Sequence, residues 1–121
     1  MIVFISASQE HERAFLQMAG SINQPIISVR DVRSAEAVIE EYRPQVVVCD
    51  TDTRDVGSWR DLLQPGVGLP DFKLIVVSRH ADDALWAEVL NLGGFDVLPI
   101  PVRREEIERV MRSALCRQPS I

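Results

Sequence analysis

The hydrophobic pattern of this chain alternates repeatedly between the pattern of buried strands and that of helices. Short, continuous apolar runs are typical of strands that are buried on both faces. Such runs lie at 2–5, 46–49 and 74–77. Two less apolar segments, 25–29 and 95–98, are predicted as further strands, and the first of these is expected to be more exposed than 2–5. Between them, apolar residues recur at the i, i+3, i+4 and i+7 spacing of helices that bury one face. Strands that alternate with helices predict a parallel sheet with helices on both faces.

The length of 121 residues suits one domain of this kind. Among doubly wound sheets, the flavodoxin-like order 2-1-3-4-5 fits five strands. We therefore expect a single five-stranded α/β domain over residues 1–118. Residues 119–121 are expected to be a tail or the start of a linker.

Local signals predict where the helices begin and which faces they bury. Ser34 is a candidate cap for the second helix, and Asp82 or Asp83 for a later one that ends at Gly93. The residues expected to face the core from these two helices are Ala35, Val38, Ile39, Tyr42, Leu85, Val89 and Leu92.

Charge and hydropathy exclude several classes of protein. The formal net charge of −5 argues against a nucleic-acid-binding surface, which is usually basic. No apolar stretch approaches the roughly 20 residues of a membrane span, and the N-terminus has no basic leader. We expect a cytoplasmic protein without membrane contact.

In a doubly wound sheet, the ligand site lies beyond the carboxyl ends of the strands. Asp50 follows four apolar residues directly, and a buried carboxylate is costly unless it is paired or functional. An aspartate there can also simply begin a turn. The candidate site residues at the strand ends are Ser6, Ala7, Asp50, Thr51, Asp52, Ser78, Arg79, Ile100 and Pro101.

Three segments resemble the receiver domain of two-component response regulators. They are PQVVVCD at 44–50, KLIVVS at 73–78 and GGFDVLPIP at 93–101. The resemblance implies that Asp50 accepts a phosphoryl group and that the Ser78 hydroxyl binds it. It also implies a divalent cation held by Asp50, the carbonyl of Asp52 and an acidic pair after the first strand, and a lysine after the fifth strand.

The chain departs from this pattern at the charged positions. Ser6 and Ala7 replace the acidic pair, Ile100 replaces the lysine, and the only lysine, Lys73, precedes the fourth strand. Any binding of Mg²⁺ is therefore expected to be weak, and no other cofactor is expected. We predict a pseudo-receiver, with weak or no phosphorylation of Asp50.

Two more substitutions bear on signalling. Arg79 stands where the family has a small residue, so it could fill the site, pair with Asp50 or point to solvent. Val97 replaces the family's switch aromatic. The resemblance implies a protein partner, such as a histidine kinase, an output domain or a second copy. The expected contact surface is the helix near 82–93, the fifth strand and the last helix, and Trp86 fits an interface only if it faces outward.

Other functions remain as alternatives. The domain could be a working phospho-acceptor through Asp50. It could also bind a flavin or nucleotide, although its first loop, SASQEHE, lacks the glycine of a phosphate cradle. We do not expect an enzyme, because Ser78 and His80 are only two residues apart and suit a catalytic triad poorly.

Overall fold

The computed structural model describes residues 1–52, 58–63 and 72–115. Its five strands form one parallel sheet in the order β2-β1-β3-β4-β5, which confirms the predicted topology. The strands are β1 (Ile2–Ile5), β2 (Ile26–Val29), β3 (Val46–Asp50), β4 (Lys73–Ser78) and β5 (Asp96–Pro99). The predicted tail at 119–121 lies outside the described residues.

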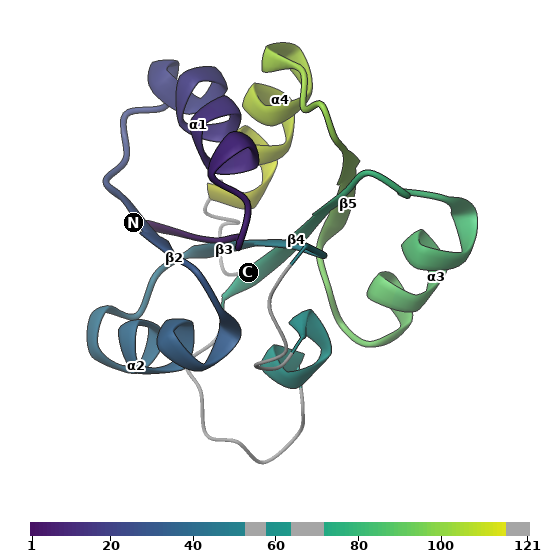
Figure 1. Cartoon of the computed structure of the whole chain (residues 1–121), viewed down its shortest axis with the longest axis horizontal. Coiled ribbons are helices and arrows are strands. Elements are labelled where there is room, and N and C mark those ends of the chain that lie inside the picture. Colours follow the sequence, from purple (N-terminus) through teal and green to yellow (C-terminus); the bar gives the residue numbers. More distant parts are fainter. Residues whose placement is uncertain (53–57, 64–71, 116–121) are drawn as a thin grey trace, which may run out of the picture.

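Helices cover both faces of the sheet (Figure 1). The α-helices are α1 (Gln9–Met18), α2 (Val32–Tyr42), α3 (Asp83–Asn91) and α4 (Arg104–Leu115), and the 3₁₀-helices are η1 (Ala19–Ser21) and η2 (Trp59–Leu63). Helices α1 and α4 pack on one face, whereas α2, η2 and α3 pack on the other. Each face therefore has its own apolar core.

Burial follows the strand order. Every residue of β1 and β3 is buried, because both strands lie inside the sheet and are covered on both faces. The edge strand β2 is only partly buried. This difference agrees with the continuous apolar runs of the inner strands.

The predicted cap of α2 is wrong. Asp31, not Ser34, is the N-cap, and its carboxylate accepts a hydrogen bond from the Ser34 amide at 2.7 Å. Ser34 is the third residue of the helix, the position whose orphan N–H an N-cap side chain satisfies. Tyr42 is also not in the core: it is the last residue of α2 and is exposed.

The prediction for α3 is confirmed except at its end. Asp82 caps the helix by accepting from the Leu85 amide at 2.8 Å, and Val89 is buried. Leu92 is exposed, contrary to expectation, because the helix already ends at Asn91. Gly93 then adopts a φ of 102°, the left-handed conformation that glycine tolerates after a helix.

No helix among the described residues is long and apolar enough to cross a membrane.

Candidate functional site

The carboxylate of Asp50 is buried at the carboxyl edge of the sheet and accepts three hydrogen bonds from the protein. Its Oδ2 accepts from the Ser6 hydroxyl at 2.7 Å and lies 2.5 Å from Nδ1 of His11. Its Oδ1 accepts from the amide of Asp52 at 2.9 Å. Both oxygens are therefore engaged, which offsets the cost of burying the charge.

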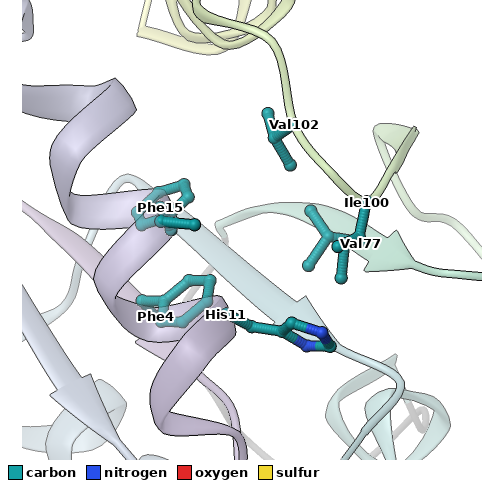
Figure 2. A pocket seen from close by; sticks show the side chains of 7 residues that line it. Phe4, His11, Phe15, Val77, Ile100 and Val102 are labelled. Atoms are coloured by element: carbon teal, nitrogen blue, oxygen red, sulfur yellow. The ribbon is translucent and has the colours of Figure 1, made fainter.

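Helix α1 places His11 in this site. Ser8 caps the helix by accepting from the His11 amide at 3.1 Å, so His11 lies in the first turn, above the strand ends. Phe15, one turn later, stacks on Phe4 of β1 with a centroid distance of 4.3 Å. Figure 2 shows His11 and Phe15 on the same side of α1, with the imidazole reaching past Phe4 toward the strand ends.

A second hydrogen bond fixes the proton on the His11 ring. Nε of Arg79 donates to Nε2 of His11 at 3.0 Å. Because Nε2 accepts, the proton of a neutral imidazole lies on Nδ1 and is donated to Asp50. Arg79 is exposed, and its guanidinium contacts His11, not Asp50. It therefore neither pairs directly with Asp50 nor points to solvent without a hydrogen bond.

Sequence reasoning missed His11. No role was assigned to this residue, and the buried stripe of α1 was not extended backward to it. His11 lies four residues before Phe15, so the same periodicity places it on the buried face. A polar residue on that stripe near the strand ends was the available signal.

Ser78 lies at the same edge as Asp50. Asp50 pairs with Val77 across β3 and β4, and Ser78 is the next residue. The Ser78 hydroxyl oxygen accepts from the Thr51 hydroxyl at 2.8 Å and from the His80 amide at 3.0 Å. The structure thus brings Ser78 and Asp50 to one edge, with the Ser78 hydroxyl held by the adjoining loops.

The residues present fit a magnesium ion poorly. Ser6 donates to Asp50 where the pattern requires an acid, and Ala7 donates its amide to the carbonyl of Asp52 at 2.9 Å. That carbonyl is the second expected ligand. Within the described parts of the chain, no group of three or more His, Cys, Asp or Glu side chains could hold a metal ion.

Ile100 places hydrocarbon where the pattern requires an ammonium group. Its side chain lines a small apolar pocket of about 20 Å³ beside His11, together with Phe15, Val77 and Val102 (Figure 2). Lys73 begins β4 and pairs with Val46, the first residue of β3. It therefore lies at the opposite edge of the sheet, as expected from the sequence.

Cys49 is buried beside the site but is not reactive. Desolvation, and then the negative charge of Asp50, raise the pKa of its thiol far above the ordinary value. The thiol therefore stays protonated, and Cys49 packs as a small, fully buried core residue.

An open cleft of about 280 Å³ lies over this edge of the sheet. The residues that line it are His11, Asp50, Thr51, Asp52, Arg79 and His80. The cleft therefore offers an imidazole, a guanidinium and hydroxyl and carboxylate oxygens to a bound group.

The fold has many counterparts among solved structures. The signal receiver domain of a protein assigned as a Luxo repressor from Vibrio parahaemolyticus superposes with a TM-score of 0.84 at 21% identity, covering 94% of this chain and 88% of that one. A two-component response regulator from Clostridium difficile superposes with a TM-score of 0.83 at 17% identity, and the match covers 98% of each chain. The signal receiver domain of an HD domain-containing protein from Pseudomonas fluorescens Pf-5 has a TM-score of 0.81 at 18% identity, covering 94% of this chain and 92% of that one.

No protein-family model and no curated protein sequence matches the chain. The likeness is therefore one of structure: the chain has the flavodoxin-like fold of response-regulator receiver domains.

Proposed function

We propose that this domain is a divergent receiver of two-component signalling that acts through protein contacts, with weak or no phosphorylation of Asp50. The observation that carries the proposal is the set of donors on Asp50: a serine hydroxyl, an imidazole and a backbone amide. They satisfy the carboxylate without a cation. They take three of the roughly four acceptor sites of the carboxylate, including both on Oδ2.

The replaced charges make phosphorylation of Asp50 slow. Phosphoryl transfer depends on positioning and on neutralising the charge of the phosphoryl oxygens. Each charge-assisted hydrogen bond that is lost costs roughly 1.5–3 kcal/mol, and about 1.4 kcal/mol corresponds to a tenfold change in rate. The absence of acids at Ser6 and Ala7 and of a lysine at Ile100 therefore lowers the rate by several orders of magnitude.

The competing function is a working, if slow, phospho-acceptor at Asp50. One observation favours it: Asp50 and the Ser78 hydroxyl lie at the same edge of the sheet. Incubation with acetyl phosphate and Mg²⁺ distinguishes the two functions. The acyl phosphate is detected by intact-mass measurement. We expect little or no product on the wild type, and the Asp50→Asn variant gives the background.

A variant that restores the charges sharpens this test. Ser6→Asp, Ala7→Asp and Ile100→Lys together supply the acidic pair and the ammonium group, and should raise the yield of acyl phosphate far above that of the wild type. Stoichiometric acyl phosphate on the wild type, abolished by Asp50→Asn, would refute the proposal. So would equal yields for the wild type and the restored variant.

The contact surface that we propose comprises α3, β5 and α4; in Figure 1, β5 lies between the two helices. Three large apolar side chains of this surface are exposed on or beside α3: Trp86, Leu90 and Leu92. Large aromatic side chains are enriched where protein partners dock. The partner proposed first is a second copy of the domain; a histidine kinase or an output domain is the alternative if the domain stays monomeric.

A further inference from the structure

We propose that Nε2 of His11 accepts a phosphoryl group, which makes His11 a modification site separate from Asp50. The proposal rests on one arrangement. One ring nitrogen of His11 is held by a buried carboxylate, while the other nitrogen lies against Arg79 at an open cleft. This inference goes beyond the proposed regulation through contacts.

The hydrogen bonds of His11 orient the nucleophile. Nδ1 carries the proton and points at Oδ2 of Asp50, 2.5 Å away. The lone pair of Nε2 therefore points away from the carboxylate, toward the guanidinium of Arg79 at 3.0 Å. A neutral imidazole of this tautomer is a nitrogen nucleophile, and histidine forms covalent intermediates in enzymes.

The transfer balances without a metal ion. With phosphoramidate as the donor, the Nε2 lone pair forms the bond to phosphorus while the phosphorus–nitrogen bond of the donor breaks. Ammonia leaves with that electron pair. The His11 ring keeps its Nδ1 proton and becomes positively charged, and the Asp50 carboxylate stabilises that charge, as a buried aspartate does beside other imidazolium rings.

Arg79 supplies the second stabilising charge. A guanidinium has five N–H donors in a fork that fits phosphoryl oxygens. Only the Nε–H donates to His11, and the residue is exposed, so its side chain can shift onto the oxygens of the incoming group with little loss of packing. The cleft of about 280 Å³ has room for that group. This arrangement needs neither the missing lysine nor the missing acids.

The test is incubation of the whole chain with phosphoramidate, with a chelator present to remove divalent cations. We expect one added phosphoryl group by intact mass, mapped to His11 by fragmentation of the wild type. The label should be stable in alkali and lost in acid, as expected of phosphohistidine, whereas an acyl phosphate is lost in both.

Variants show whether the label depends on His11 or reflects the general reactivity of histidines with phosphoramidate. His80→Gln is the matched control, because His80 lines the same cleft, and it should keep the label. His11→Gln should lose it. Asp50→Asn removes the charge that stabilises the ring and should slow labelling about tenfold or more.

Several outcomes would overturn the inference: no label on the folded wild type, a label on His80, or labelling of His11→Gln equal to that of the wild type. Mapping on the wild type keeps the test valid even if His11→Gln fails to fold. An absent label would leave the proposed function standing. An alkali-labile label on Asp50, formed without a cation, would overturn both proposals.

Discussion

Nδ1 of His11 lies 2.5 Å from Oδ2 of Asp50 and joins the first turn of α1 to the end of β3. The contact places a donor from the protein where the receiver pattern would place a cation or a phosphoryl group. It also explains how a buried carboxylate is tolerated without a cation or a lysine beside it.

The first prediction concerns the stability that this contact contributes. His11→Ala removes one donor from Asp50 and a buried ring, so it should lower the free energy of unfolding by about 1–3 kcal/mol. Urea denaturation measures the loss. His80→Ala is the control: the residue is exposed, and its substitution should change stability by less than about 0.5 kcal/mol. Equal effects of the two variants would contradict a stabilising pair.

The second prediction concerns the close packing after α3. A Cβ atom at Gly94 would lie 2.4 Å from Cγ1 and 2.9 Å from the carbonyl oxygen of Val89. Gly94→Ala should therefore lower the free energy of unfolding by about 1–3 kcal/mol, the usual cost of overpacking. At Gly20 no atom beyond the glycine and its chain neighbours lies within 4 Å of the added carbon, so Gly20→Ala is the matched control. A Gly94→Ala variant as stable as Gly20→Ala would show that this contact is not tight.

The third prediction is a pH dependence at the cap of α2. The hydrogen bond from the Ser34 amide lowers the pKa of Asp31 below its ordinary value of 3.8. Because the pKa is lower in the folded than in the unfolded chain, the cap stabilises fully above that value. Its contribution is lost as the pH falls through the folded-state pKa.

Melting temperatures of the wild type and Asp31→Ala, measured across acidic pH, test this dependence. The difference in melting temperature between the two proteins should become smaller as the pH falls below 3.8. Asp31→Ser, which caps without titrating, should keep its advantage over Asp31→Ala at low pH. A gap that is constant with pH would rule out a titrating cap.

The fourth prediction concerns the proposed contact surface. Trp86 on α3 is 50% exposed, and Tyr42 on α2, outside that surface, is 52% exposed. Trp86→Ala should weaken self-association, measured by sedimentation at several concentrations, whereas Tyr42→Ala should not. A domain that stays monomeric at high concentration would exclude the second copy as partner, and equal effects of the two variants would exclude the α3 face.

The topology could be predicted from the sequence because its signals are strong and local. Short continuous apolar runs are typical of strands covered on both faces, and right-handed crossovers restrict how such strands connect. The ends of the helices are encoded less clearly in the sequence. Ser34 and Asp31 are both good capping residues, and only the backbone conformation at Asp31 shows which of them caps α2. Leu92 fits the stripe of α3, but the helix ends one residue before it.

The site could be predicted as a location but not as a set of contacts. The strand-end rule places Asp50, Ser78 and Ser6 at one edge, and the structure does the same. The periodicity of α1 places His11 on the buried face, but its hydrogen bond with Arg79 joins residues 68 positions apart. No local pattern encodes such a contact.

We expect the internal donors on Asp50 to take the place of a cation. An Mg²⁺ titration followed by backbone amide shifts measures whether they do. No saturable shift changes should occur at residues 6, 7 and 50–52 in the wild type, whereas the Ser6→Asp, Ala7→Asp variant should show clear saturation. Saturable, localised shifts in the wild type, abolished by Asp50→Asn, would contradict this expectation.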